Sequence, residues 1–142
     1  MKEIKYYCEA DQENDKITIH RGGKDSPVIA NATHCLEKDG VTDIHFVDPK
    51  FTICMEHAHT YLPFFHGKHS FSYNDKKYHW KGHTALIDDE TGVLIAALHT
   101  RFREPDPQKL GTLVVTPDGR PMLDLAAITC LIIQERSEEG RL

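Results

Sequence analysis

The sequence has few cysteines, and none of them lies close to another. Its four cysteines are at positions 8, 35, 54 and 130, and no Cys-x-x-Cys pair occurs. This scarcity excludes a disulfide-dense miniprotein. The first seven residues are charged and lack the apolar run of a secretory signal peptide. We therefore expect a reducing, cytoplasmic setting in which the cysteines act as small buried hydrophobic residues.

Long hydrophobic runs and an excess of positive charge are also missing. The longest apolar stretch, residues 125–133, is about half of the ~20 residues that cross a bilayer, so no membrane-spanning segment is predicted. Seventeen Lys and Arg stand against 22 Asp and Glu, for a net charge of −5, which argues against a nucleic-acid partner. With 142 residues, 39% of them hydrophobic, residues 1–142 are expected to form one soluble globular domain.

The motifs of several common enzyme classes are absent. The sequence contains no Gly-x-Ser-x-Gly nucleophile elbow, no P-loop, no Gly-x-Gly-x-x-Gly and no His-Glu-x-x-His. The glycine pair Gly22-Gly23 is too short to cradle a phosphate group. No cofactor is therefore predicted.

What the sequence does have is a series of short apolar runs separated by turn residues. Residues 1–16 are expected to form a strand followed by a solvated loop. After residue 16 the runs recur about every ten residues, which is typical of an all-β sandwich or barrel. Tight hairpin turns are predicted at Asn74-Asp75 and at Gly92, and the first hairpin carries an aromatic strand face around Trp80.

The end of the chain departs from this pattern. Residues 124–139 open with Asp124 as a candidate N-cap, are rich in Ala and Leu early, and turn polar late, so a helix is predicted. Residues 125–133 are apolar on every side except at Thr129, and such a helix must be buried all round. A final buried strand is the alternative, because isoleucines such as Ile128 suit a strand too. We predict a mainly β fold, an antiparallel β-barrel wrapped around a C-terminal hydrophobic α-helix.

The order of motifs in the second part of the chain resembles that of a known superfamily. The motifs are Tyr78-x-Trp80, the acidic turn at Asp88-Asp89, Gly92-Val93, Gly111-x-Leu113 and then the apolar helix. This order is similar to the tubby C-terminal-like superfamily, which includes tubby proteins, the LURP-one-related proteins of plants and the phospholipid scramblases. It looks particularly like small fungal domains of that superfamily. The resemblance covers about residues 44–136 and implies a β-barrel around a central helix, and it carries over almost no catalytic residue.

The resemblance also implies a ligand. Tubby domains bind phosphoinositide headgroups through clustered Lys and Arg, and the nearest match here is the cluster of Lys76, Lys77 and Lys81. The cluster is small and lies on an acidic protein, and a lysine pair in a hairpin turn is often only a solvated edge. A phosphoinositide is therefore one expected partner among several.

Four of the ten histidines lie within residues 56–69. On a strand, His57 and His59 point to one face and can share a metal ion. His66 and His69 then complete a tetrahedral set of metal ligands, and Glu56 accepts a hydrogen bond from one of these histidines. The His-x-His pair is similar to that of cupins, but no Glu follows three to five residues later. Surface and loop imidazoles are the alternative and the favoured interpretation.

The histidines also suit acid–base chemistry near neutral pH, as in a small lyase or isomerase of the cyclase type. The candidates are His57, His59, His79, His83 and His99, with Glu56 and Asp88 as carboxylates that orient them. Against this, the predicted central helix fills the space in which a lipocalin-like barrel keeps its ligand. Any pocket must then lie at an open end or between strand edges.

The segment that follows His57 and His59 carries three aromatic residues beside Pro63. Apolar side chains in a loop are unfavourable when nothing covers them. We predict that Tyr61, Phe64 and Phe65 line or close the best concave site, with His57 or His59 at its wall. The alternative is that the rings plug one end of the barrel.

The leading functional hypothesis is a non-catalytic binding domain for a small molecule, a lipid headgroup or a protein partner, with Lys77 and Lys81 as further ligand contacts. A His-based lyase or isomerase and a metal site at His57 and His59 are the alternatives.

Overall fold

The fold is known from a computed structural model, which describes residues 4–58, 67–82, 84–99 and 111–138. Within these residues the chain is mainly β, with ten strands in one sheet followed by a 3₁₀ helix and an α-helix. The strands are β1 (Tyr6–Asp11), β2 (Lys16–Arg21), β3 (Val28–His34), β4 (Val41–Phe46), β5 (Phe51–Ala58), β6 (Lys68–Tyr73), β7 (Lys76–Lys81), β8 (Ala85–Asp88), β9 (Leu94–His99) and β10 (Thr112–Val115). The helices are η1 (Pro117–Met122) and α1 (Leu123–Glu138).

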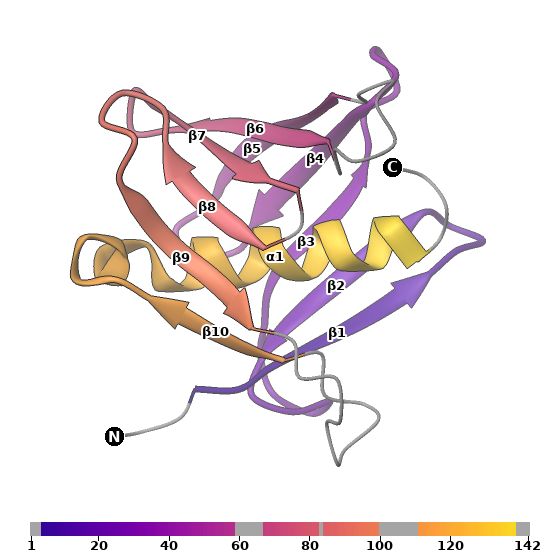
Figure 1. Ribbon diagram of the computed structural model, residues 1–142. Coiled ribbons are helices and arrows are strands. Elements are labelled where there is room, and N and C mark those ends of the chain that lie inside the picture. The colour runs from indigo at the N-terminus through magenta and orange to yellow at the C-terminus, as the bar shows by residue number, and fades with distance from the viewer. Residues whose placement is uncertain (1–3, 59–66, 83, 100–110, 139–142) are drawn as a thin grey trace.

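Each strand pairs antiparallel with its neighbours in the chain, so the strand order in the sheet equals the sequence order. Figure 1 shows that the sheet curls around α1, which runs along its concave side. Within the described residues, no hydrogen-bonded strand pairing joins β1 to β10. These are the two end strands of the sheet, and we call their outer edges the seam. The predicted antiparallel β fold with a C-terminal helix is confirmed, whereas closure into a barrel stays a prediction.

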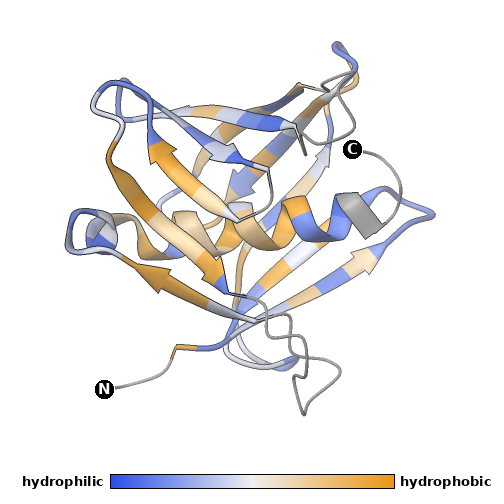
Figure 2. Cartoon of the chain, viewed as in Figure 1, coloured by the Kyte–Doolittle hydropathy of each residue, from blue (hydrophilic) through white to orange (hydrophobic). Residues whose placement is uncertain are grey.

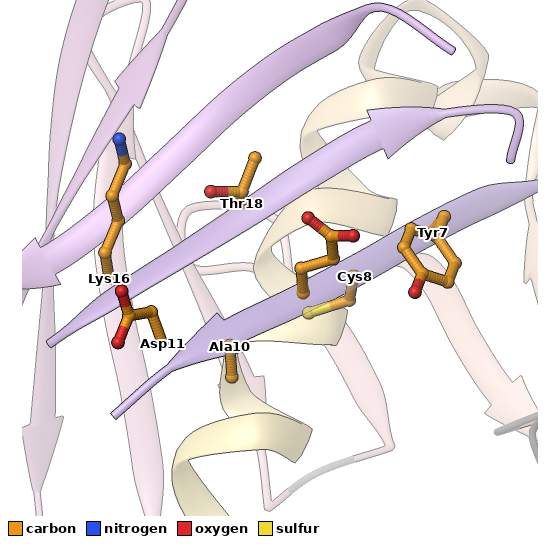
Figure 3. Close-up of a pocket in the computed structure, with 7 residues that line it drawn as sticks. Tyr7, Cys8, Ala10, Asp11, Lys16 and Thr18 are labelled. Carbon is orange, nitrogen blue, oxygen red and sulfur yellow. The ribbon is translucent and has the colours of Figure 1, made fainter. Parts of the chain in front are cut away.

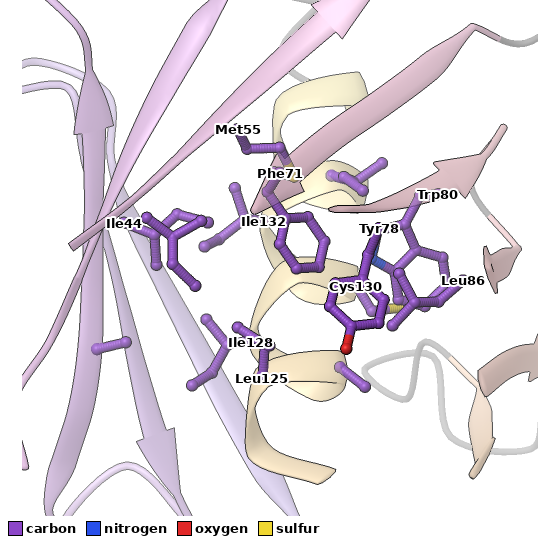
Figure 4. Close-up of a cluster of buried hydrophobic side chains, with 14 of the residues drawn as sticks. Ile44, Met55, Phe71, Tyr78, Trp80, Leu86, Leu125, Ile128, Cys130 and Ile132 are labelled. Carbon is purple, nitrogen blue, oxygen red and sulfur yellow. The ribbon is translucent and has the colours of Figure 1, made fainter. Parts of the chain in front are cut away.

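Burial on every side explains the composition of α1. All side chains from residue 125 to residue 130 are buried, and so are Ile132 and Ile133. A surface helix keeps a polar face, whereas here Ile44 lies on one side of α1 and Trp80 on the other (Figure 4). The predicted helix is therefore confirmed over Leu123–Glu138, and the alternative of a final strand is wrong. No helix in the described part of the chain is long and apolar enough to cross a membrane.

The start of α1 differs from the sequence-based expectation. Asp124 is not the N-cap, because η1 runs directly into α1 and places Asp124 in the first helical turn. Its carboxylate accepts a hydrogen bond from the Tyr6 hydroxyl and lies 3.5 Å from the Arg21 guanidinium. Burial and the carboxylate acceptor raise the pKa of Tyr6 above its ordinary value, so the hydroxyl stays protonated. These contacts tie the start of α1 to β1 and β2.

The last described turn of α1 is tied to the sheet by a buried cation. Arg136 is 1% exposed, and its guanidinium donates to the Asp15 carboxylate at 2.6 Å. His34 Nε2 lies 3.2 Å from the same guanidinium, and the His34 backbone N–H donates to Asp15 at 2.9 Å. We call Asp15, His34 and Arg136 the Arg136 cluster. The first turn and the last described turn of α1 are thus both fixed, through charged groups, to the first three strands and their turns.

One hydrogen bond in the core joins the sheet to the helix. Trp80 is fully buried on β7, and its indole N–H donates to the Thr129 hydroxyl at 2.8 Å. That hydroxyl donates in turn to the Leu125 carbonyl oxygen at 2.9 Å. Thr129, the polar residue within the apolar run of α1, therefore has hydrogen-bond partners for its hydroxyl group. Figure 2 shows the apolar run of α1 giving way to hydrophilic residues in its later turns.

The predicted turns are confirmed. Asn74 and Asp75 have φ values of 51° and 62°, which are the left-handed values that a two-residue turn between β6 and β7 requires. Gly92 has a φ of 73° in the turn between β8 and β9. The first residues also follow the prediction, because β1 leads into a mostly exposed turn at residues 12–15.

Candidate functional site

Three polar side chains form a connected group on the inner side of β4, β5 and β6. Thr42 and His69 are buried and His57 is half-buried, and their positions alternate with more exposed residues on β5 and β6. His57 and His69 are direct cross-strand partners. Their Nδ1 atoms lie 2.8 Å apart, and His57 Nε2 lies 2.8 Å from the Thr42 hydroxyl. The group is continuous with the Arg136 cluster, because Thr42 pairs with His34 across β3 and β4.

These distances define what the His57–His69 pair can do. One proton lies between the two Nδ1 atoms, so one ring donates and the other accepts. Two protonated rings would set N–H donors against each other, so the pair holds at most one extra proton while this bond lasts. Two imidazole nitrogens on one tetrahedral zinc ion are about 3.3 Å apart, given Zn–N bonds of about 2.0–2.1 Å. The observed separation of 2.8 Å is therefore that of a hydrogen bond.

The predicted metal set lies only partly within the described residues. His57 and His69 are there, whereas His59 and His66 lie outside them. In the part of the chain that the structure describes, no three His, Cys, Asp or Glu side chains gather so as to hold a metal ion. Glu56, predicted to assist a ligand or orient a histidine, is exposed on the outer side of β5, opposite to the inner side that carries His57. The structure thus joins two members of the predicted set by a hydrogen bond.

The other acid–base candidates are dispersed. His79 faces outward on β7, where its Nδ1 is hydrogen-bonded to the Asp89 carboxylate. Asp88 does not orient a histidine, because its Oδ1 accepts hydrogen bonds from two backbone N–H groups of its own turn. His99 is exposed at the end of β9, and His83 lies outside the described residues. Within the described chain, no common acid–base site joins His79, Asp88 and His99.

One pocket of the described part of the chain was not predicted. The predicted aromatic set of Tyr61, Phe64 and Phe65 lies outside those residues, so its position stays a prediction. A pocket of about 600 Å³ lies instead along β1 and β2. It is lined by Tyr7, Cys8, Glu9, Ala10, Asp11, Lys16 and Thr18 (Figure 3). A short charged segment with little periodicity gives no sequence signal for a concave surface, so sequence reasoning missed it.

The outer side of the β6–β7 hairpin carries a group of lysines. Lys68 and Lys81 are direct cross-strand partners, and Lys77 is opposite Ser72. All three lysines are exposed and alternate with buried residues of the two strands. Among the described side chains, no carboxylate lies within ion-pair distance of any of the three. We call Lys68, Lys77 and Lys81 the lysine face.

The lysine face is a local excess of positive charge on an acidic chain. Residues 68–81 contain four lysines and one aspartate, although the whole chain has a net charge of −5. Lys76, a member of the predicted cluster, forms an ion pair instead, since its Nζ lies 3.8 Å from the Asp88 carboxylate. Sequence reasoning missed Lys68, although a two-residue turn at Asn74-Asp75 already implies that position 68 pairs with position 81.

Comparison with known proteins gives a family. No curated protein and no solved structure matches the chain. A protein-family model described as a family of unknown function (DUF6593) matches residues 4–139, a range that includes all ten strands and α1. The chain therefore belongs to the DUF6593 family.

Proposed function

We propose that this protein is a non-catalytic binding domain whose lysine face recognises a phosphate-bearing headgroup. The observation that carries the proposal is the direct pairing of Lys68 with Lys81 on the outer side of the sheet. Like charges opposite each other destabilise a sheet. An anion placed between the two ammonium groups relieves that repulsion, so the pairing favours a ligand of opposite charge.

Neighbouring side chains supply hydrogen-bond donors for the same ligand. Ser70 is opposite His79, and Ser72 is opposite Lys77, all on the outer side of the hairpin. Hydroxyl groups can donate to phosphate oxygens, and lysine ammonium groups add charge on flexible stems. Charge and hydroxyl donors on one small surface are the chemistry that a phosphate monoester needs.

Among phosphate-bearing ligands, we favour the headgroup of a phosphoinositide in a membrane. Val93 and Leu94 are exposed where β9 begins, and Leu94 pairs with Ile87, which in turn pairs with His79 of β7. Apolar side chains beside lysines suit a lipid surface, where lysines meet headgroups and apolar groups enter the interface. The resemblance to tubby domains supports the same choice.

The test is co-sedimentation with vesicles of phosphatidylcholine alone and of phosphatidylcholine with phosphatidylinositol bisphosphate. Each lysine near an anionic surface contributes about 1 kcal/mol, so the double variant Lys68→Gln/Lys81→Gln is expected to bind the second vesicles about 30-fold more weakly. The matched control is Lys24→Gln/Lys50→Gln, which removes the same charge at exposed positions elsewhere.

The control should bind like the wild type. Equal binding of the two double variants would contradict the proposal. If soluble inositol phosphate binds as tightly as the vesicles do, the ligand is a free phosphate ester and the membrane part of the proposal is wrong.

The inner histidines give less support to an enzyme. A general base needs a substrate within hydrogen-bond reach. The nitrogens of His57 are directed at His69 and Thr42, and the pocket along β1 and β2 is lined by no histidine. A lyase or isomerase using His57 therefore ranks below the binding hypothesis. A metal site at His57, His59, His66 and His69 is a third hypothesis, and metal analysis of the purified protein tests it, since a stoichiometric metal ion would favour it.

We also propose that DUF6593 domains are tubby-like barrels that work in the cytosol. The helix enclosed by a curled ten-stranded sheet supports the first part. The second part is supported by the four cysteines, all within the described residues and none in a disulfide. An experimental structure with α1 packed outside the sheet would refute the barrel, and localisation of the full chain to a secretory compartment would refute the cytosolic setting.

A further inference from the structure

His79 lies in the middle of a row of outward-facing residues that crosses five strands. It is opposite Ser70 of β6 on one side and opposite Ile87 of β8 on the other. Beyond these two residues the row continues to Glu56 of β5 and to the exposed Leu94 of β9. His79 therefore lies between the hydroxyl groups of the β6–β7 hairpin and the apolar side chains that suit a lipid surface.

The lysine face lies around this histidine. Lys77 and Lys81 are two residues before and after His79 on β7, so the three side chains share a face, with about 6–7 Å along the strand between neighbours. Lys68 is opposite Lys81 and therefore diagonal to His79, a separation that a long side chain spans. One phosphate group can thus contact the imidazole ring and the lysine ammonium groups together.

Asp89 determines which nitrogen of the His79 ring carries the proton. A carboxylate accepts hydrogen bonds, so Nδ1 of His79 donates to it. In the neutral ring Nε2 then carries only a lone pair, which repels a phosphate oxygen, whereas in the imidazolium form Nε2 also donates. The His79 side chain is 19% exposed, and Nε2 makes no hydrogen bond with another described residue. His79 can therefore bind a phosphate oxygen only after it has taken up a proton.

The charged groups that face His79 come from four parts of the sheet. The lysine face supplies three ammonium groups from β6 and β7. Asp89 follows β8, and Glu56 of β5 lies beyond Ser70, while β8 itself contributes the apolar Ile87. Three ammonium groups against these two carboxylates leave one net positive charge, and protonation of His79 makes it two. The protonation state of one imidazole ring thus doubles the local excess of positive charge.

We propose that His79 is a further ligand of the phosphate group at the lysine face and that it acts only in its imidazolium form, which Asp89 positions. The inference rests on the proposed headgroup binding and adds to it a residue that responds to pH. Histidine gains its proton between about pH 8 and pH 5, so affinity for the headgroup should rise as the pH falls through this range. A phosphate monoester itself takes up a proton near about pH 6 and loses charge, which opposes the gain at lower pH.

The test is co-sedimentation with vesicles of phosphatidylcholine and phosphatidylinositol bisphosphate at about pH 8 and about pH 6.5, for wild type and His79→Gln. Glutamine keeps an amide donor for Asp89 but takes up no proton, and titration of the lipid affects both proteins equally. On acidification the affinity of wild type should rise about two- to fivefold more than that of His79→Gln, because one added cation near an anionic surface is worth up to about fivefold. His45→Gln is the matched control, since His45 is an outward-facing histidine of β4 whose Nδ1 is hydrogen-bonded to Thr52, and it should keep the pH response of wild type.

A second variant tests the positioning role of Asp89. In Asp89→Asn the side-chain amide can donate to Nδ1 of His79, which leaves the proton of the neutral ring on Nε2. Nε2 then donates at both pH values, so the ratio of the two affinities should fall to that of His79→Gln while binding at the higher pH becomes stronger. An unchanged ratio in Asp89→Asn would show that Asp89 does not set the proton of the ring.

The outcomes separate this inference from the proposed function. If wild type binds the vesicles and His79→Gln shows the same pH response, the lysine face binds the headgroup without His79, and the inference is wrong while the proposed function stands. If wild type binds the vesicles at neither pH, the proposed function is wrong, and the inference is wrong with it. A larger pH response in wild type and in His45→Gln than in His79→Gln supports both.

Discussion

The interior of the curled sheet has two regions that differ in kind. Around Trp80 and Ile128 it is apolar, apart from the hydrogen bond to Thr129, and its stability comes from buried area. Where His34, Thr42, His57 and His69 lie on β3 to β6 it is polar, with the His57–His69 pair beside Thr42 and next to the Arg136 cluster. Buried polar groups destabilise a protein unless each finds a partner. The stability of the first region therefore depends on buried volume, and that of the second on a few specific contacts.

The apolar region should fail completely when a charge enters it. Ile128→Asp buries an unpaired carboxylate, which costs several kcal/mol against a total stability of about 5–15 kcal/mol, so the variant should not fold. Ile128→Val, the matched control, should lose only about 1 kcal/mol. Far-UV circular dichroism and urea unfolding measure both. A folded Ile128→Asp protein with near-normal stability would mean that this part of α1 is not enclosed.

The polar region should depend strongly on one carboxylate. Asp15→Asn removes the carboxylate that pairs with the buried Arg136 guanidinium, and because Asp15 itself is partly exposed, the expected loss is about 2 kcal/mol, below the range for fully buried pairs. Asp25→Asn, in an exposed loop, should lose almost nothing. Urea unfolding at neutral pH gives both values. Equal stability of the two variants would show that the Arg136 cluster contributes little.

The same carboxylate gives the polar region a pH dependence. Burial by itself raises the pKa of Asp15, but hydrogen bonds from Arg136 and the His34 backbone N–H outweigh it and hold the pKa below its ordinary value. A lowered folded-state pKa means that the stabilisation is complete above the unfolded value of about 3.9 and is lost as pH falls below it. Wild type should therefore lose more stability than Asp15→Asn on acidification from pH 5 to pH 3. Parallel loss in both proteins would contradict this assignment.

The link between sheet and helix should have a smaller effect. Thr129→Val removes the acceptor for the Trp80 indole N–H at almost constant volume, and the expected loss is about 1–2 kcal/mol. Thr129→Ser keeps the hydroxyl and should retain the hydrogen bond while losing a methyl group. Trp80 fluorescence during urea unfolding reports the difference directly. If the serine variant is the less stable of the two, the methyl contact matters more than the hydrogen bond.

The outer surface should respond in the opposite direction. Removing the repulsion between Lys68 and Lys81 by Lys68→Gln should raise the free energy of unfolding by about 0.5 kcal/mol while it weakens ligand binding. Lys24→Gln, at an exposed position away from the hairpin, should change neither quantity. Added salt should shrink the gain, because it screens the lysine charges. A loss of stability in Lys68→Gln would show that the paired lysines do not repel each other appreciably.

The sequence predicts the fold well wherever local pattern decides the structure. An apolar run without a polar side has to be enclosed, and α1 is; Asn74-Asp75 suits a left-handed turn, and the β6–β7 hairpin follows from it. The role of Asp124 was mispredicted because η1 extends the helical path before it. Contacts between distant positions were out of reach, since Arg136 and Asp15 are 121 residues apart and no local signal joins them.

The candidate site was predicted less well for the same reason. His57 and His69 were both candidates, yet their direct hydrogen bond depends on how β5 and β6 pair, which the sequence does not give. Successive side chains of a strand point to opposite faces, so Glu56 faces away from His57. The alternating sequence pattern of that strand already implied this. Lys68 could have been found from the hairpin register. The pocket along β1 could not, because concavity has no counterpart in residue order.

The sequential strand order has a consequence for how the chain is made. Each strand pairs with the one before it, so hairpins can form in turn as the chain leaves the ribosome. The helix that fills the concave side follows all ten strands, so the inner apolar face of the sheet is complete before α1 exists to cover it. During that interval the nascent protein exposes Ile44, Met55 and Leu86, which the finished protein buries. Chains interrupted before residue 123 should therefore be the ones that chaperones hold and that aggregate when released.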